Sequence, residues 1–332
     1  MNQNARVGTG VPPVQAERSS AVSDSYPWQD LGAQSNIGRS VQKTMTSQSP
    51  AGTVTLGGEL TVHRLGYGAM RLTGPGIWGP PNDRARALAV LRRAVELGVN
   101  FIDTADSYGP NVSEELIAEA LSPYPKDLVI ATKGGWVRTG PGFWSHNATP
   151  EHLRKAVEGS LKRLRLDRID LYQLHIPDPI VPLEASVGTL AELRSEGKIR
   201  LIGLSNVTRE HIERARKIVP IVSVQNRYSF ADREWDYVVD YCTQNGIVFI
   251  PWFPLGAGQA AKETVQRIAK AHGAKPLQLA LAWLLQRSTL MLPIPGTSSF
   301  EHLEENMLAA SLRLTEQEFR ELAGVPELTF SR

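Results

Sequence analysis

Residues 100–133 decide the fold, and they read NFIDTADSYGPNVSEELIAEALSPYPKDLVIATK. Asn100 to Ala105 is a short run with the length and composition of a buried strand, and Leu128 to Lys133 is another. Between them, Ser113 to Leu121 has apolar residues at the spacing of an amphipathic helix. A strand, a helix and a second strand in direct succession are typical of a parallel sheet whose strands are covered by helices.

The same alternation of apolar runs and amphipathic stretches continues along the chain from residue 54 onward. The predicted strands are Leu65 to Ala69, Asn100 to Ala105, Leu128 to Lys133, Ile169 to His175, Arg200 to Ser205, Ile221 to Asn226, Ile247 to Trp252 and Leu290 to Pro295. The predicted helices are Asp83 to Leu97, Ser113 to Leu121, Thr149 to Leu164, Leu183 to Glu196, Thr208 to Ile218, Glu234 to Asn245, Thr264 to Gln286 with a break near Gly273 to Pro276, and Ser299 to Ala310. Eight such strands favour an α/β fold of the closed (β/α)8 type, a TIM barrel. An open doubly wound sheet is less favoured, because Gly66 to Met70 has only part of the glycine spacing of a phosphate-binding turn.

Further elements flank the predicted barrel. Thr53 to His63 has two adjacent glycines between β-prone flanks, which predicts an N-terminal β-hairpin at the barrel bottom. Thr315 begins a capping-box sequence, which predicts an extra C-terminal helix through about Ala323. Residues 1–50 are rich in Ser, Gln, Asn, Gly and Pro without a hydrophobic period, so we expect a disordered extension before one barrel domain over residues 51–332.

The composition is that of an ordinary globular protein with a small-molecule partner. The chain has 332 residues, of which 42% are hydrophobic and 21% charged, and its formal net charge is +2. Basic residues are spread along the chain, which argues against binding to nucleic acid or to an anionic membrane surface. Cys242 is the only cysteine, which excludes an internal disulfide. Because there is also no apolar stretch of the kind that signal peptides and membrane spans have, we expect a cytoplasmic protein.

Polar residues stand at the carboxyl ends of five consecutive predicted strands, on the face where (β/α)8 barrels carry function. They are Asp103 with Tyr108 after it, Lys133, His175, Ser205 with Asn206, and Gln225 with Asn226. Each of them alone also fits a structural role, such as a helix cap for Asp103 or a solvated strand end for Lys133. Barrel packing does not require all of them on one rim, so together they predict an active site.

Four of these residues fit proton transfer coupled to hydride transfer. A tyrosine hydroxyl has a pKa near 10, too high for ready proton exchange near neutrality. A lysine cation would lower the pKa of Tyr108 by stabilising the phenolate, so we assign this role to Lys133, and to Asp103 the role of holding the lysine charged and oriented. A neutral His175 would hydrogen-bond the substrate carbonyl oxygen and help to polarise it.

These segments resemble those of the aldo-keto reductase superfamily. Asn100 to Gly109 is similar to the family signature that contains its catalytic Asp and Tyr, Ala131 to Gly134 to its lysine segment, and Leu171 to His175 to its histidine segment. The resemblance spans roughly Thr53 to Ala323 and implies an oxidoreductase that transfers a hydride between NADP(H) and an aldehyde, a ketone or the corresponding alcohol. The catalytic residues that it implies are Asp103, Tyr108, Lys133 and His175, with Tyr108 as the general acid and base.

The resemblance also implies where the cofactor binds. Ser205, Asn206 and Gln225 correspond to the residues that hydrogen-bond the nicotinamide carboxamide, and Trp252 stands where family members carry a stacking tyrosine. The other implied cofactor-binding residues are Pro254, Leu255, Gly256, Gly296, Thr297, Ser298, His302, Glu305 and Asn306. Many members have Lys in place of Gly296 and Arg in place of His302, and such cations favour a 2′-phosphate. Gly296 and His302 lack these cations, so the implied cofactor is NADP(H) only because it is the usual cofactor of the family, and NAD(H) is the alternative.

Aromatic residues in the predicted loops above the barrel favour a broad apolar mouth and a hydrophobic or moderately bulky carbonyl substrate. They are Trp78, Trp136, Phe143 and Trp144, each of which alone also fits loop packing. Two other functions are alternatives: a cofactor-binding regulatory subunit on the same fold, and a metal-dependent hydrolase that would use His175 and Asp178. The hydrolase is disfavoured, because the seven histidines never occur in the His-x-His or His-x-x-x-His spacing. We therefore expect no metal, and the sequence indicates no oligomeric state.

Overall fold

A curled parallel sheet forms the centre of the computed structural model, which describes residues 49–254 and 262–324. In order across the sheet, its strands are β3 (Tyr67–Gly68), β4 (Phe101–Asp103), β5 (Val129–Gly134), β8 (Ile169–Leu174), β9 (Ile199–Ser205), β10 (Ser223–Gln225) and β11 (Val248–Phe249). All neighbouring pairs are parallel, so the carboxyl ends of the strands share one rim. Seven of the eight predicted barrel strands are thereby confirmed.

The segment Leu290–Pro295 takes the eighth position without forming a regular strand, which corrects the prediction there. Pro293 and Pro295 have no N–H to donate, so a regular ladder cannot continue through them. The backbone of this segment still forms hydrogen bonds with its neighbours on both sides. Phe249 of β11 makes two hydrogen bonds with the segment, each 2.9 Å long, and the N–H of Gly66 donates to the Pro293 carbonyl at 2.9 Å. The segment therefore closes the ring between β11 and β3, in agreement with the predicted (β/α)8 class.

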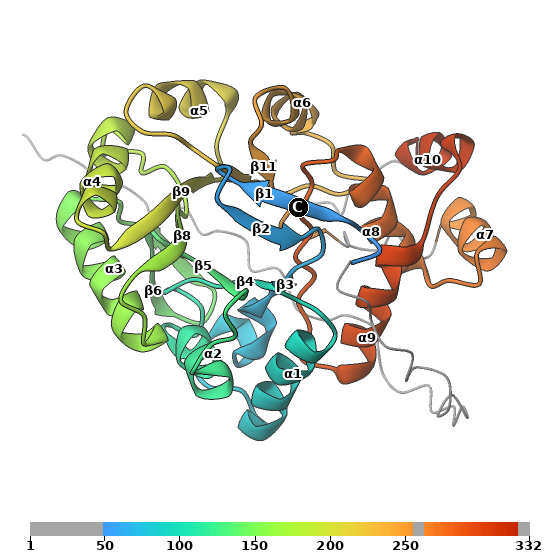
Figure 1. The fold of residues 1–332 in the computed structure, drawn as a ribbon, viewed down its shortest axis with the longest axis horizontal. Coiled ribbons are helices and arrows are strands. Elements are labelled where there is room, and N and C mark those ends of the chain that lie inside the picture. Colours follow the sequence, from blue (N-terminus) through green and yellow to red (C-terminus); the bar gives the residue numbers. More distant parts are fainter. Residues whose placement is uncertain (1–48, 255–261, 325–332) are drawn as a thin grey trace, which may run out of the picture.

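The helices lie around the outside of the sheet (Figure 1). They are α1 (Arg84–Glu96), α2 (Val112–Leu121), α3 (Pro150–Leu164), α4 (Leu183–Ser195), α5 (Arg209–Arg216), α6 (Asp236–Gln244), α7 (Glu263–Ala271), α8 (Pro276–Arg287), α9 (Phe300–Leu308) and α10 (Glu316–Ala323). The predicted caps hold: Thr149 accepts the N–H of His152 before Pro150 begins α3, and Thr315 makes a capping box with Glu318 before α10. Within residues 49–254 and 262–324, no helix has the length and apolar character that crossing a membrane requires.

The predicted N-terminal hairpin closes the barrel bottom. Its strands β1 (Thr53–Leu56) and β2 (Leu60–His63) pair antiparallel and lie across the centre of the ring of helices (Figure 1). Val54, Leu56 and Val62 share a core cluster with the inward residues of the barrel strands, among them Val129 and Leu171. This apolar plug separates the lower end of the barrel from the rim that carries the polar residues. Residues 1–48 of the predicted extension lie outside the described residues.

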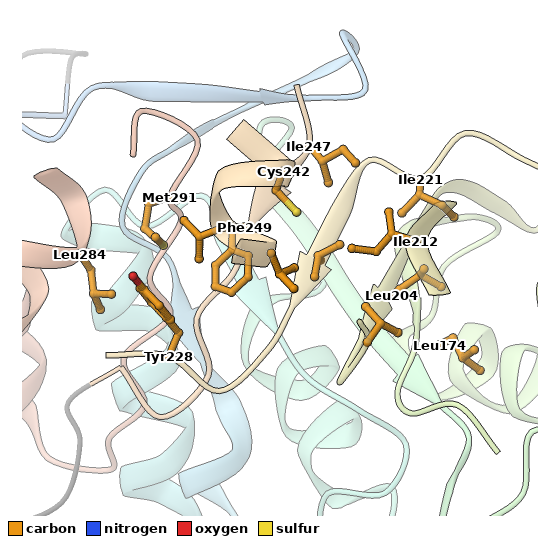
Figure 2. Packing of buried hydrophobic residues seen from close by; sticks show 14 of the residues in the cluster. Leu174, Leu204, Ile212, Ile221, Tyr228, Cys242, Ile247, Phe249, Leu284 and Met291 are labelled. Carbon is orange, nitrogen blue, oxygen red and sulfur yellow. The ribbon is translucent and has the colours of Figure 1, made fainter. Parts of the chain in front are cut away.

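The largest core cluster packs the second half of the sheet against helices α3 to α8 and α10. Figure 2 shows part of it, where the ring of Tyr228 meets Phe249 edge to face with centroids 5.6 Å apart. Cys242 is buried in the same cluster, and burial raises the pKa of its thiol to about 12. The cysteine is thus a protonated residue that packs in the core.

Several short elements were not predicted. The 3-10 turns are η1 (Ala69–Leu72), η2 (Pro75–Ile77) and η4 (Ala309–Ser311). The strands β6 (Trp136–Gly140) and β7 (Phe143–His146) form an antiparallel hairpin between β5 and α3, where the sequence analysis expected an aromatic loop. The sequence feature that indicates this hairpin is Gly140-Pro141-Gly142, a turn sequence between β-prone residues, and Gly142 has a φ of 73°.

Candidate active site

The four predicted catalytic residues meet at the carboxyl rim. Asp103 ends β4, Tyr108 follows in the next loop, Lys133 lies near the end of β5 and His175 follows β8. Lys133 Nζ donates to Asp103 Oδ1 at 2.5 Å and to Tyr108 Oη at 3.3 Å. The rings of Tyr108 and His175 stand edge to face with centroids 5.8 Å apart. All four side chains are buried, so the tyrosine oxygen lies between an ammonium group and an imidazole in a low-dielectric environment.

Two glutamines complete the bonding of Asp103. Its Oδ2 accepts from Gln173 Nε2 at 3.1 Å and from Gln225 Nε2 at 2.9 Å. The lysine ammonium also donates to the carbonyl of Thr104 at 3.0 Å. A buried ion pair is tolerated when further hydrogen bonds satisfy both charges, and this pair meets that condition. Gln173 was missed by the sequence analysis. The signal was available, because Gln173 lies two residues before His175 and therefore on the same inward face of β8.

The pKa values of Lys133 and Tyr108 are both raised. Burial works to lower the pKa of Lys133, but Asp103 and Tyr108 outweigh it and raise that pKa above its ordinary value. Burial also raises the pKa of Tyr108, and the opposing effect of Lys133 is too small to reverse this. The sequence analysis expected a lowered tyrosine pKa. Tyr108 is thus a neutral phenol beside the Lys133 ammonium, which is the protonation state of a general acid.

His175 is held as a neutral imidazole. Burial lowers its pKa well below the ordinary value, and the charge of Lys133 lowers it further. The hydroxyl of Ser107 lies 3.4 Å from His175 Nδ1. The ring therefore presents hydrogen-bonding nitrogen without a competing charge, as the sequence analysis predicted.

Replacing His175 by glutamine is expected to flatten the dependence of stability on pH in mildly acidic solution. Since the folded pKa lies below the unfolded value of about 6.5, the unfolded chain takes up a proton first as the pH falls. Wild-type protein should therefore lose up to about 1.4 kcal/mol of unfolding free energy per pH unit below pH 6.5 through this group. Urea unfolding at a series of pH values between 5 and 8 measures it. An equal slope in both proteins would contradict the neutral state of His175.

The residues assigned to the nicotinamide lie beside this tetrad. Asn206 has a φ of 57°, and its Nδ2 donates to the His175 carbonyl at 3.0 Å. Its Oδ1 accepts from Trp252 Nε1 at 3.0 Å, which fixes the indole while the ring stays 36% exposed. Ser205 is buried at the end of β9, and Gln225 bonds Asp103 through its amide nitrogen. An exposed aromatic face thus stands next to a set of side-chain amides at the barrel mouth.

The other residues that the resemblance assigns to the cofactor lie just before α9, in α9 itself and after Trp252. The Tyr67 hydroxyl donates to the Thr297 carbonyl at 2.5 Å, and Arg86 of α1 donates to the Ser298 carbonyl at 3.2 Å. His302 is exposed in the first turn of α9, Asn306 is buried, and Glu305 is paired with Lys275. Pro254 is buried; Leu255 and Gly256 lie outside the described residues.

Gly296 occupies a close approach of two backbones. A Cβ built there would lie 2.5 Å from the carbonyl oxygen of Gly68, so the residue cannot carry a side chain unless β3 or its neighbour shifts. The absence of a lysine at this position therefore has a steric reason in this chain. We expect Gly296→Ala to lower the free energy of unfolding by about 1–3 kcal/mol, measured by urea denaturation.

The matched control is Gly188→Ala. Gly188 lies inside α4, and a Cβ there would meet nothing within 4 Å. This change should raise the free energy of unfolding by about 0.5–1 kcal/mol, because alanine is the better helix former. Equal effects of the two substitutions would show that the contact at Gly296 is relaxed without cost.

Three of the four predicted mouth aromatics come together. The ring of Trp136 stands edge to face with Trp144 at 5.8 Å and with His175 at 6.4 Å between centroids. Trp78 lies on the other side of Arg138, whose guanidinium is 5.7 Å from the Trp78 ring and 3.7 Å from the Trp144 ring. Phe143 does not join them, because it is 66% exposed at the start of β7. Trp78, Trp136 and Trp144 thus form an aromatic wall that reaches the imidazole of His175.

Asp178, named for the hydrolase alternative, has a different role. Its carboxylate accepts the backbone N–H groups of Ala148, Ile180 and Val181, which shape the loop before α4. Across residues 49–254 and 262–324, no group of three or more His, Cys, Asp or Glu side chains is arranged to bind a metal. The described site thus has the groups for proton transfer and lacks a ligand set for metal-assisted hydrolysis.

Comparisons with known proteins show what this chain is similar to. A family model described as the aldo/keto reductase family matches residues 64–327. Among curated proteins, the chain is 48% identical over 288 residues to an uncharacterized oxidoreductase of Schizosaccharomyces pombe, which covers 86% of this chain and 94% of the relative. It is also 48% identical over 280 residues to the pyridoxine 4-dehydrogenase of Escherichia coli, covering 82% of this chain and 98% of the relative.

Solved structures give the same result for the fold. An aldo-keto reductase from Klebsiella pneumoniae, crystallised in complex with NADPH, superimposes with a TM-score of 0.71 at 27% identity. The match covers 84% of this chain and 94% of that structure. The ring-closing segment and the short barrel strands are thus compatible with a complete reductase barrel.

Proposed function

Because the chain belongs to the aldo/keto reductase family, we propose that this oxidoreductase uses NADP(H) to interconvert a carbonyl compound and its alcohol. The observation that carries the proposal is the position of the Tyr108 oxygen, 3.3 Å from Lys133 Nζ and beside a neutral His175. This arrangement suits the transfer of one proton to a developing alkoxide.

The residues present fit a nicotinamide cofactor. Trp252 offers a partly exposed indole, and Asn206 and Gln225 offer amide oxygens that can accept from a carboxamide N–H; the Asn206 oxygen already accepts one hydrogen bond, from Trp252. Because Nε2 of Gln225 donates to Asp103, the carbonyl oxygen of Gln225 remains as the acceptor for a carboxamide N–H. When bound, NADP(H) supplies or accepts the hydride. The NADPH complex of the Klebsiella pneumoniae structure supports this choice of cofactor.

The protein side of the mechanism is a proton transfer at Tyr108. In the reductive direction the neutral phenol donates its proton to the substrate oxygen, and His175 donates a hydrogen bond to the same oxygen as negative charge develops there. The phenolate that remains lies next to the Lys133 ammonium, which Asp103 holds in place. In the oxidative direction the same contacts favour removal of the alcohol proton.

For the substrate, we propose an aromatic aldehyde and its alcohol, with pyridoxal and pyridoxine as the first pair to test. The wall of Trp136 and Trp144 beside His175 provides flat apolar faces at the reacting end of the site. The pyridoxine 4-dehydrogenase of Escherichia coli, which is 48% identical, supports this pair.

The test combines cofactor binding with turnover. We expect fluorescence titration to give tighter binding of NADPH than of NADH, and NADPH oxidation to follow addition of pyridoxal. Tighter binding of NADH would contradict the cofactor assignment. NADPH binding without turnover on pyridoxal and a broad panel of aldehydes and ketones would instead favour the regulatory-subunit alternative.

A further inference from the structure

Arg138 of β6 binds three separate parts of the mouth with one guanidinium group. Its acceptors are the backbone carbonyls of Gly76 (2.9 Å), Ile77 (3.0 Å), Ser107 (3.4 Å), Gly140 (3.5 Å) and Phe143 (3.0 Å). They belong to the loop after β3, the loop after β4 and the β6–β7 hairpin. A guanidinium has five N–H donors in a fixed plane, and here each finds a carbonyl. The residue therefore ties the three segments together.

The buried guanidinium of Arg138 has aromatic rings and backbone carbonyls around it instead of a carboxylate. The residue is only 7% exposed, and none of the ion pairs among the described residues includes it. The guanidinium instead lies against the ring of Trp144 at 3.7 Å and near that of Trp78 at 5.7 Å. Carbonyl dipoles and aromatic faces thus take the place of a carboxylate. Because the guanidinium plane is fixed by its hydrogen bonds, it also fixes the indole rings that pack against it.

Two series of contacts connect Arg138 with Tyr108 and His175. Ser107, whose carbonyl Arg138 binds, precedes Tyr108 in the chain, and its hydroxyl lies 3.4 Å from His175 Nδ1. On the other side, Trp144 contacts Trp136, which contacts His175 edge to face. A shift of Arg138 would therefore move the aromatic wall relative to the oxygen of Tyr108.

We propose that Arg138 is a positioning residue that sets substrate specificity, since it holds Trp78 and Trp144, which together with Trp136 form a wall that selects planar aromatic carbonyl compounds over aliphatic ones. The inference rests on the proposed carbonyl reduction and adds a residue to it. Arg138 does not touch the reacting atoms. Its effect should appear in the ratio of kcat/KM between two aldehydes rather than in turnover as such.

The experiment compares 4-nitrobenzaldehyde with butanal, each with NADPH. In Arg138→Met, kcat/KM for the aromatic aldehyde should fall about 100-fold, mainly through KM, since a displaced wall no longer orients the ring. For butanal the fall should stay within about fivefold, because a small flexible substrate uses little of the wall. Arg138→Lys should resemble Arg138→Met, since an ammonium keeps the charge but has neither five donors nor a plane. The control Arg154→Met, on the outer surface of α3, should change neither value.

A second variant covers the case in which Arg138 substitutions fail to fold. Trp144→Leu leaves the backbone acceptors of Arg138 in place and removes one stacked face, so it should produce the same loss of selectivity. Equal losses on both aldehydes, or no loss, would overturn the role of Arg138 while carbonyl reduction stands. A wild-type enzyme that binds NADPH and reduces neither aldehyde would overturn the proposed function itself.

Discussion

Replacing Tyr108 by phenylalanine is expected to lower kcat for carbonyl reduction about 10³-fold, with NADPH affinity unchanged within about twofold. The substitution removes the hydroxyl that lies 3.3 Å from Lys133 Nζ and keeps the ring that stacks edge to face on His175. The proton donor is thus lost while the shape of the site stays. Steady-state kinetics with NADPH and the best aldehyde, together with a fluorescence titration of NADPH, measure both quantities.

The matched control for this variant is Tyr237→Phe. Tyr237 lies on α6, half exposed, with its ring tilted against that of Trp235 at 6.0 Å between centroids. Loss of that hydroxyl should change neither kcat nor NADPH affinity. Turnover of Tyr108→Phe within about tenfold of wild type would exclude Tyr108 as the general acid, because positioned proton transfer accounts for about 10²–10⁴ in rate.

The barrel was predictable because strands and helices alternate along the chain, and the hydrophobic residues are spaced differently in the two kinds of element. Each strand is short and apolar, and each helix carries its own start or stop signal, such as Thr149-Pro150 before α3. The exception is instructive. Leu290–Pro295 has the composition of a strand, but its prolines remove the donors that a ladder needs, so only bridging hydrogen bonds form. Hydrophobic pattern alone does not distinguish these two cases.

The tetrad was predictable for a geometric reason, whereas its electrostatics were not. Parallel strands of one sheet bring their carboxyl ends to one rim, so polar residues at successive strand ends must be neighbours. The pKa of Tyr108, however, depends on how completely the surrounding side chains exclude water, and burial outweighs Lys133. That balance depends on packing across four strands and is not encoded in any one motif.

Arg138 shows what sequence motifs leave out. All of its acceptors are backbone carbonyls, and carbonyls carry no sequence signature. In the sequence it is one arginine among aromatic residues of an expected loop. Its role depends on the β6–β7 register, which places Arg138 opposite Trp144, and on a loop after β3 that lies far away in the chain.

Replacing Lys133 by methionine is expected to lower the free energy of unfolding by about 3–5 kcal/mol, because it leaves the carboxylate of Asp103 buried without its cation. The pair is 2.5 Å apart, and both side chains are almost completely buried. Urea unfolding measures the loss. The control Lys155→Met breaks an exposed i,i+4 pair with Glu151 on α3, and should leave the urea midpoint unchanged, because solvent screens exposed pairs.

A double-mutant cycle with Asp103→Asn separates the ion pair from the packing around it. Lys133→Met and Asp103→Asn each leave one charge unpaired, whereas the double variant removes both charges. We therefore expect the double variant to be more stable than the sum of the single losses predicts, by about 2–3 kcal/mol. Strict additivity would mean that each variant loses only its own packing and hydrogen bonds. In that case the bonds from Gln173 and Gln225, rather than Lys133, would be what stabilises the carboxylate at the centre of the site.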